Sequence, residues 1–176
     1  MRIISGQLKG RRIQAPRKLP VRPTTDRAKE GLFNILQHRL ELDTLSVLDL
    51  FSGTGNMSYE FASRGTPEIT AIDQNRHCVQ FINQTSELLN LNIQTLQSDC
   101  FQFLEKTLKT FDLIFADPPY VFDTEQYEKL IALGQTKLKP QGILIIEHFE
   151  KIHFNHCGGF NFNRSYGKST FSFFGE

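Results

Sequence analysis

A short acidic and proline-rich motif, Asp117-Pro118-Pro119-Tyr120, is the part of this sequence that most directly suggests chemistry. It follows the apolar run at residues 111–116, which predicts a short buried strand that the proline pair ends. Neither proline donates a backbone hydrogen bond, so we expect their carbonyl oxygens to point outward as acceptors beside the Asp117 carboxylate. Next to an aromatic ring, such acceptors suit a planar group that carries an amino nitrogen. The alternative is a plain proline-rich turn with Tyr120 packed on the surface.

Three aspartates at the ends of predicted strands form a second candidate site: Asp49, Asp73 and Asp99. The first strand runs into a turn in which Gly53 and Gly55 let the backbone approach a ligand closely. Asp73 can bind both hydroxyls of a ribose, Asp99 can accept a hydrogen bond from an adenine amino group, and Asp49 can hold an ammonium group. A ligand with these three parts and no pyrophosphate fits the set, and S-adenosylmethionine (AdoMet) is such a ligand. Taken singly, each aspartate has a plain alternative as a capping or solvated residue.

The elements that must position these motifs alternate along the chain. Apolar runs predict strands at residues 46–50, 68–72, 93–97, 111–116 and 142–147, with two closing strands at 160–164 and 169–174. Helical patterns lie between them, at residues 57–64, 76–89, 100–108 and 124–137. This order predicts an α/β fold with a doubly wound, seven-stranded, mostly parallel sheet and helices on both faces. Such sheets bind ligands beyond the carboxyl ends of the strands, where both candidate sites fall.

The first 40 residues carry most of the positive charge. They hold ten Lys or Arg residues and two acidic ones, a net charge of +8 in a chain whose total is +1, so the remainder is −7. Residues 2–5 and 11–15 predict a small β-hairpin, and Thr24-Thr25-Asp26 offers an N-cap to a helix after a proline-punctuated linker at residues 16–23. The asymmetry indicates an arm that binds a polyanion. A solvated basic tail that binds nothing specific is the alternative.

Cysteine and histidine usage favours a reduced protein without a metal site. The three cysteines are odd in number and lack CxxC spacing, which is typical of free thiols in the cytosol: Cys78, Cys100 and Cys157. His148, His153 and His156 lie near Cys157 without clean ligand spacing, and we expect no metal there. No apolar run approaches a membrane span, and the N-terminus begins no signal peptide. We expect a cytoplasmic protein without a membrane partner, and a monomer by default.

Taken together, the motifs resemble the RsmD family of 16S rRNA guanine-N2 methyltransferases, within the class I AdoMet-dependent methyltransferases. The resemblance covers nearly the whole chain and rests on Met1-Arg2-Ile3-Ile4-Ser5-Gly6, Lys9-Gly10-Arg11, Arg22-Pro23-Thr24-Thr25-Asp26-Arg27, Leu32-Phe33-Asn34, Asp49-Leu50-Phe51-Ser52-Gly53-Thr54-Gly55, Ser63-Arg64-Gly65, Asp117-Pro118-Pro119-Tyr120 and Tyr166-Gly167. Many amino-methyltransferases share the glycine and Asp-Pro-Pro-Tyr motifs, whereas the basic N-terminal block is particular to this family. Two stretches depart from the family pattern: Asn56-Met57-Ser58 and Lys168-Ser169.

The resemblance implies a Rossmann-like class I methyltransferase core at residues 41–176, preceded at residues 1–40 by a basic, RNA-binding hairpin and helix. It implies methylation of the exocyclic N2 amino group of a guanine in small-subunit rRNA, guanine 966 in the family, with rRNA or the small ribosomal subunit as partner. The residues expected to bind AdoMet are Asp49, Phe51, Gly53, Gly55, Asp73, Asp99, Cys100 and Asp117.

The same resemblance implies how the acceptor base is held. Asp117 and the Pro118 carbonyl would accept hydrogen bonds from the N2 amino group and align it with the methyl group, while Tyr120 stacks on the base. No metal is required. The residues expected to grip RNA phosphates are Arg2, Lys9, Arg11, Arg12, Arg17, Lys18 and Arg22.

Two other interpretations remain open from the residues alone. Related Asp/Asn-Pro-Pro-Tyr motifs serve enzymes that methylate adenine N6 in DNA or a glutamine amide, and no residue here excludes adenine. A non-catalytic RNA-binding protein that retains the fold is the alternative from a different class. The intact set of Asp49, Gly53, Gly55, Asp73 and Asp117 argues against such loss of activity.

Overall fold

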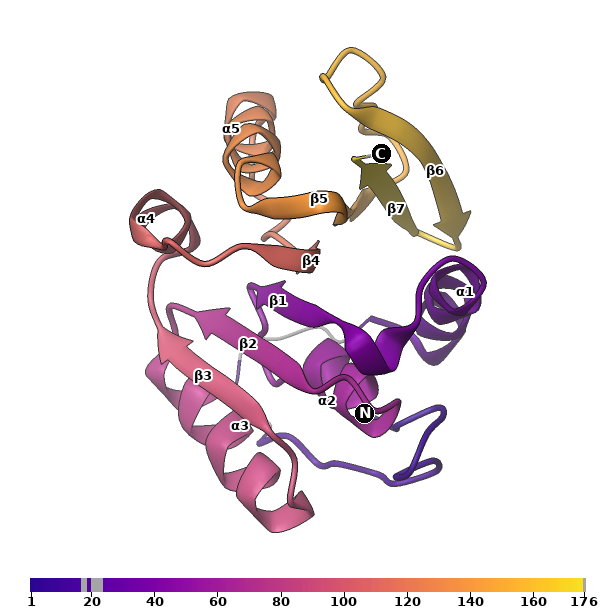
Figure 1. The fold of residues 1–176 in the computed structure, drawn as a ribbon, viewed down its shortest axis with the longest axis vertical. Coiled ribbons are helices and arrows are strands. Elements are labelled where there is room, and N and C mark those ends of the chain that lie inside the picture. The colour runs from indigo at the N-terminus through magenta and orange to yellow at the C-terminus, as the bar shows by residue number, and fades with distance from the viewer. Residues whose placement is uncertain (17–18, 20–23, 176) are drawn as a thin grey trace.

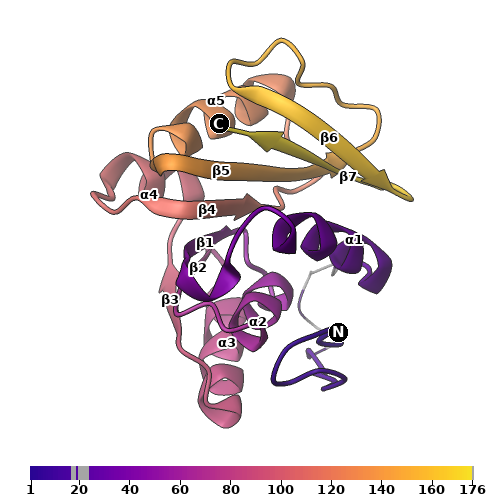
Figure 2. The ribbon, with the colours of Figure 1, turned by 45° about the vertical axis from the view of Figure 1, so that its right-hand side comes forward.

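The computed structural model describes residues 1–16, 19 and 24–175. Within them, seven strands form one sheet in the order β3-β2-β1-β4-β5-β7-β6 (Figures 1 and 2). The strands are β1 (Ser46–Leu50), β2 (Glu68–Asp73), β3 (Ile93–Gln97), β4 (Phe111–Ala116), β5 (Leu138–Phe149), β6 (Phe160–Tyr166) and β7 (Ser169–Phe174). The helices are α1 (Asp26–Gln37), α2 (Asn56–Ser63), α3 (Arg76–Leu89), α4 (Cys100–Lys106) and α5 (Thr124–Gln135), with a short 3-10 helix η1 (Leu42–Thr44).

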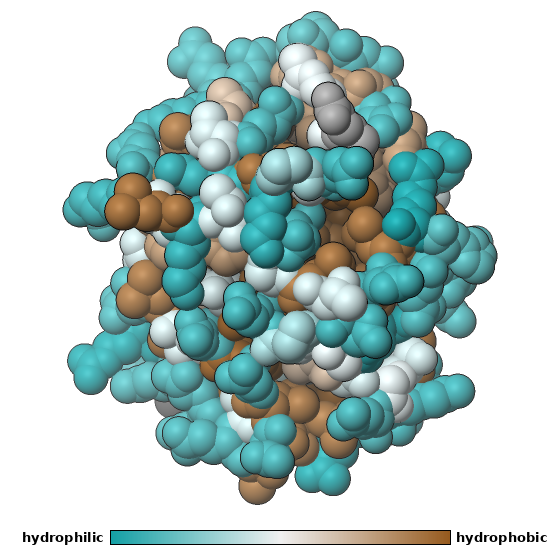
Figure 3. All heavy atoms as spheres, in the orientation of Figure 1, coloured by the Kyte–Doolittle hydropathy of each residue, from teal (hydrophilic) through white to brown (hydrophobic). Residues whose placement is uncertain are grey.

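Two hydrophobic clusters, one on each face, hold the helices to the sheet. Because successive strand residues point to opposite faces, Val47 of β1 packs with Phe33 of α1 and Ile82 of α3. Its neighbour Leu48 packs with Leu130 of α5 on the other face. Hydrophilic side chains predominate on the surface seen in Figure 3, with apolar ones showing in separate patches, one of them in a hollow near its middle. Among the described residues, no helix is both long and apolar enough to cross a membrane.

The strand order creates a crevice at one edge of the sheet. β1 pairs in parallel with β2 on one side and β4 on the other, so the chain winds away from β1 in both directions. Ligands of such sheets bind outside the carboxyl ends of the strands at this switch point. β7 runs antiparallel to both β5 and β6, which brings the β6–β7 turn to the same edge. The predicted seven-stranded, mostly parallel sheet is confirmed.

Strand β5 is the element that differs most from its predicted bounds. It begins at Leu138 instead of residue 142, because Leu138 already pairs with Phe111 of β4. The ladder is irregular after this pair, and Gln141 adopts a left-handed φ of 63°. A side chain at the next position, Gly142, would approach the Lys139 carbonyl oxygen to 2.9 Å. The proline and glycine that interrupt the apolar pattern therefore mark a bulge within the strand, not its start.

The N-terminal segment pairs with itself less extensively than a β-hairpin. Arg2 and Arg12 form one antiparallel bridge, and the Ile3 N–H donates to the Arg11 carbonyl at 2.9 Å. Tight turns around Gly6 and Gly10, both with φ of 83°, form the predicted connection between the two arms. Ile3 is buried in the same cluster as α1 and the core strands, so residues on both sides of residue 40 share one hydrophobic core.

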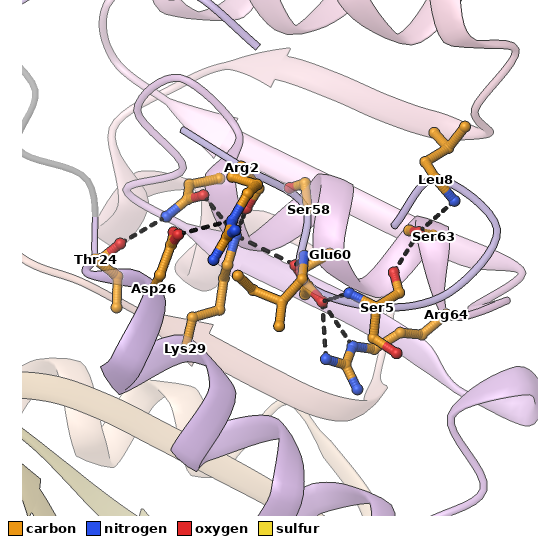
Figure 4. A network of polar contacts seen from close by, with 12 residues as sticks. Arg2, Ser5, Leu8, Thr24, Asp26, Lys29, Ser58, Glu60, Ser63 and Arg64 are labelled. Atoms are coloured by element: carbon orange, nitrogen blue, oxygen red, sulfur yellow. Dashed lines mark hydrogen bonds and ion pairs between the residues drawn. The ribbon is translucent and has the colours of Figure 1, made fainter. Parts of the chain in front are cut away.

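A buried ion network fastens this segment to helices α1 and α2 (Figure 4). The carboxylate of Glu60 on α2 accepts hydrogen bonds from the Ile4 and Ser5 N–H groups at 2.8 and 3.0 Å. It also pairs with Arg64 at 2.8 Å and with Lys29 of α1 at 3.2 Å. The side chains of Glu60 and Lys29 are almost fully buried. Burial lowers the pKa of Lys29, and the Glu60 charge opposes that change.

Neutralising Glu60 should therefore destabilise the fold strongly. In Glu60→Gln the buried Lys29 ammonium loses its counter-charge, and we expect the unfolding free energy to fall by about 3–5 kcal/mol. Glu105→Gln is the matched control, because its ion pair with Lys129 is half exposed and such pairs contribute at most about 1 kcal/mol. Urea unfolding of both variants measures the difference. Equal losses of stability in the two variants would contradict a structural role for the network.

Candidate active site

A cavity of about 480 Å³ opens at the carboxyl edge of the sheet, beside the ends of β1, β2 and β4. Seven of the eight residues expected to bind the cofactor line it, together with the whole proline motif. The lining residues that the sequence had singled out are Asp49, Phe51, Gly53, Asp73, Asp99, Cys100, Asp117, Pro118, Pro119 and Tyr120. The two candidate sites are therefore walls of one cavity.

The glycine turn after β1 combines two roles. Gly53, with φ of 53°, lines the cavity and donates its N–H to Asp73 Oδ2 at 2.8 Å. Gly55 does not line the cavity: it is the left-handed N-cap of α2, and a side chain there would meet the Tyr59 ring at 2.9 Å. Phe51 also has a positive φ, 57°, a strained conformation for a bulky residue that often marks functional turns.

Asp73 is anchored by the backbone that surrounds it. Besides the Gly53 N–H, it accepts a hydrogen bond from the Asn75 N–H at 2.8 Å, and Asn75 in turn caps α3. Burial raises the pKa of Asp73, and these two hydrogen bonds act in the opposite direction. The carboxylate is thus held in one orientation in the wall of the cavity.

Asp49 is more deeply enclosed. Its carboxylate accepts hydrogen bonds from both the N–H and the hydroxyl of Ser58. Burial, only partly offset by these bonds, raises the pKa of Asp49 to about 7. Ser58 belongs to the stretch that departs from the family pattern, and its spacing from Asp49 gave no sign of this contact. Asp49 borders the cavity, but one of its oxygens is committed to α2.

Asp99 shows that the capping and cofactor interpretations are compatible. It is the N-cap of α4, and its Oδ1 accepts from the Gln102 N–H at 3.0 Å. It also lines the cavity and remains exposed. Its neighbour Cys100 is buried in the cavity wall, and burial raises the pKa of that thiol to about 12. Cys100 therefore contributes an uncharged, apolar surface.

Within the proline motif, the Asp117 carboxylate is enclosed, whereas the Tyr120 ring is exposed. Burial, then the charges of Glu147 and Asp49, raise the pKa of Asp117 well above its usual value. Tyr120 is 45% exposed, with its ring centroid 4.0 Å from that of Phe149.

One expectation about the motif is wrong. The Pro119 carbonyl is not an outward-facing acceptor, because it accepts a hydrogen bond from the Phe122 N–H at 3.0 Å and closes a turn. The acceptor role of the Pro118 carbonyl stays a prediction. Pro118 itself is buried.

Two residues of the site were missed by sequence reasoning, Thr24 and Glu147. The Thr24 hydroxyl donates to Glu147 Oε2 at 2.7 Å, and Thr24 lines the cavity. Glu147 lies near the end of β5, so the rule that selected the other strand-end acids could have found it. Thr24 belongs to the predicted N-cap and to a stretch that carries the family resemblance, but neither pattern indicated that it lines the cavity.

The histidines near Cys157 in the sequence differ in their surroundings. His148 is buried, with its ring nitrogens at 2.7 Å from Ser172 Oγ and the Phe149 carbonyl oxygen. Within the described part of the chain, the one group with metal-ligand proximity is Glu128, His156 and Cys157, whose ligand atoms lie within 4.8 Å of one another. His156 and Glu128 already form an ion pair at 2.9 Å.

The structure describes only some of the basic residues expected to bind RNA. Lys9, Arg11 and Arg12 are exposed, whereas Arg2 pairs with Asp26 of α1 at 3.0 Å. The remaining three, Arg17, Lys18 and Arg22, lie outside the described residues.

The seven-stranded fold and its cavity lined by strand-end carboxylates define a class I methyltransferase. The family model described as Conserved hypothetical protein 95 matches residues 1–175. The ribosomal RNA small subunit methyltransferase D of Buchnera aphidicola subsp. Baizongia pistaciae is 32% identical over 150 residues, covering 84% of this chain and 75% of that protein. The chain therefore belongs to this family, the RsmD family that its motifs resemble.

Solved structures agree with the fold. The hypothetical protein TTHA0928 of Thermus thermophilus matches with a TM-score of 0.86 and 21% identity, over 100% of this chain and 99% of that one. The T. thermophilus 16S rRNA N2 G1207 methyltransferase RsmC, in complex with AdoMet and guanosine, matches with a TM-score of 0.72 and 21% identity. That match covers 90% of this chain and 45% of RsmC.

The raised pKa of Asp49 predicts a specific pH dependence of stability. At pH values between 3.8, the ordinary pKa of an aspartate, and about 7, Asp49 has lost its proton in the unfolded chain but keeps it in the folded protein. Stability therefore falls as the pH rises through this range. Asp49→Asn cannot ionise. We expect its unfolding free energy to fall less between pH 5 and pH 7 than that of the unmodified protein, by up to roughly 1.4 kcal/mol per pH unit.

Urea unfolding at the two pH values measures this difference, and Asp43→Asn, at an exposed position, is the matched control. An Asp49→Asn variant with the same pH dependence as the unmodified protein would show that Asp49 does not hold its proton in the folded state.

Proposed function

We propose that this protein transfers the methyl group of AdoMet to the exocyclic N2 amino group of a guanine in small-subunit rRNA. The observation that carries the proposal is that the strand-end carboxylates and the Asp-Pro-Pro-Tyr motif line one cavity. Family relatives named for methylation of small-subunit rRNA support the substrate class. Guanine 966 is the target that the family resemblance suggests.

The residues of the cavity fit AdoMet in charge and in shape. Asp73 is oriented to accept hydrogen bonds from ribose hydroxyls, and Asp99 lies at the next strand end for the adenine amino group. Gly53 lets the backbone approach the ligand. A cluster of buried carboxylates favours a ligand that carries positive charge. When bound, AdoMet supplies a methyl group activated by the positive sulfonium.

The acceptor nitrogen needs positioning more than it needs a strong base. The lone pair of guanine N2 is delocalised into the ring, so hydrogen bonds from its N–H groups to Asp117 and the Pro118 carbonyl draw density back to nitrogen and fix its direction. The raised pKa of Asp117 suits it to accept the proton that N2 releases after transfer.

Tyr120 provides a surface for the target base. Its exposed ring is backed by Phe149, which limits the conformations it must give up on binding. Stacking of a base on such a ring contributes about 1–3 kcal/mol. The base has to leave its own helix or loop to reach the cavity, and this contact offsets part of that cost.

The exposed basic residues of the N-terminal segment bind RNA phosphates in this proposal. Lys9, Arg11 and Arg12 supply affinity and register, not base choice. The activity belongs in the cytoplasm, where small ribosomal subunits and their rRNA are present. That the protein acts as a monomer stays a prediction.

Asp117→Ala should separate chemistry from cofactor binding. We expect methyl transfer to small subunits to fall by about a hundredfold or more, because the variant loses the acceptor that orients N2. Calorimetric titration should show AdoMet affinity largely retained. Glu125→Ala, an exposed acid on α5, is the control and should keep full activity. Unchanged turnover in Asp117→Ala would remove Asp117 from the mechanism.

The double variant Arg11→Gln/Arg12→Gln tests the RNA-binding role of the N-terminal segment. Removing one phosphate contact should reduce the slope of log affinity against log salt by about 1, so we expect a shallower slope and weaker binding. Lys106→Gln/Lys109→Gln is the matched control, because it removes the same charge from exposed positions at the end of α4 and in the loop that follows it. RNA binding by filter retention at several salt concentrations measures both variants. A salt slope that is the same in both would count against the segment.

A further inference from the structure

Thr24 lines the cavity, but the proposed chemistry assigns it no role. It immediately precedes the N-cap of α1, is 9% exposed and lines the cavity with Asp117. Two contacts fix it in place. Its carbonyl accepts from Asn56 Nδ2 at 3.1 Å, and its hydroxyl donates to Glu147 Oε2 at 2.7 Å. Thr24 is therefore held from both sides at the wall of the cavity.

The bond to Glu147 determines what the Thr24 hydroxyl can offer a ligand. A hydroxyl has one proton and two lone pairs. Because the proton is donated to Glu147, the oxygen can only accept hydrogen bonds on its cavity side. Burial raises the pKa of Glu147, and the hydrogen bonds that its carboxylate accepts from Thr24 and Ser169 oppose this change.

Glu147 also brings Thr24 close to the acceptor site. Ala116 of β4 pairs with Ile146 of β5 in parallel register, so the residues that follow, Asp117 and Glu147, lie side by side. Their charges interact. One carboxylate thus contacts the Thr24 hydroxyl and neighbours the group proposed to hold the target amine. The cavity wall at this point presents acceptors from both Asp117 and Thr24.

Such a wall distinguishes the two purines. Beside its N2 amino group, guanine carries a hydrogen on N1, whereas the N1 of adenine, beside its N6 amino group, is an acceptor. On the basis of the proposed function, we infer that Thr24 accepts a hydrogen bond from guanine N1–H and so selects guanine, and that Glu147 is the positioning residue that keeps the Thr24 hydroxyl an acceptor. Adenine would place its N1 lone pair against the Thr24 oxygen and leave both unpaired, which such sites reject.

The test compares two RNAs that differ only in the target base, guanine or 2-aminopurine. Both carry a 2-amino group, but N1 of 2-aminopurine has no hydrogen. We expect the unmodified protein to methylate the guanine RNA with a kcat/KM about tenfold or more above that of the 2-aminopurine RNA, the value of one hydrogen bond. Because each ratio comes from one protein preparation, partial unfolding of a variant cancels.

Four variants locate the effect. Thr24→Val removes the hydroxyl, and Glu147→Gln removes the carboxylate that orients it, so both should lower the guanine preference by several fold. Thr24→Ser keeps the hydroxyl and should keep the ratio. Thr136→Val is the matched control, because it removes a threonine hydroxyl that donates to the Leu133 carbonyl from a residue that does not line the cavity, and its ratio should equal that of the unmodified protein.

A guanine preference that survives in Thr24→Val would overturn the role of Thr24 while leaving the proposed function intact. Failure of the unmodified protein to form N2-methylguanosine would overturn the proposed function, and this inference with it.

Discussion

The buried carboxylate of Glu60 is the interaction on which the arrangement of this protein depends. A fully enclosed charge must be neutralised and hydrogen-bonded, and the partners of Glu60 come from three places: Lys29 of α1, Arg64 of α2 and the N-terminal segment. Lys29 also donates to Asn56 at 2.9 Å, and Asn56 holds Thr24. The need to satisfy one acid therefore connects the basic segment to the wall of the cavity.

The parallel sheet imposes the second constraint, because its carboxyl edge collects acids from strands that are distant in sequence. Burial raises the pKa of Asp49, Asp117 and Glu147. The charges of Glu147 and Asp49 raise the pKa of Asp117 further. Such a cluster costs stability in the empty protein. It is suited to a ligand whose ammonium and sulfonium charges offset the clustered negative charge, so the same feature that weakens the fold favours AdoMet.

Periodicity and turn chemistry predicted most of the fold because the strands are short apolar runs bounded by glycine, proline or aspartate. Because those strand ends could be located, the position of Asp73 and Asp99 next to them was enough to predict that both residues lie at the cavity. What could not be predicted depends on contacts between distant residues. Lys29 counted as one more positive charge of the basic segment, yet it is buried against Glu60. Thr24 donates to Glu147, which is 123 residues away in the sequence, and no local pattern encodes this pair. The bonds of Asp49 with Ser58 and of Pro119 with Phe122 are short-range, but they depend on side-chain direction and turn geometry that residue types alone do not specify.

The central claim is that one cavity holds both AdoMet and the guanine amino group that receives its methyl group. The most direct measurement incubates the protein and methyl-labelled AdoMet with small ribosomal subunits from cells that lack it, followed by digestion of the rRNA to nucleosides. The account predicts that the label elutes as N2-methylguanosine. Label in N6-methyladenosine, or no label in rRNA at all, would contradict it.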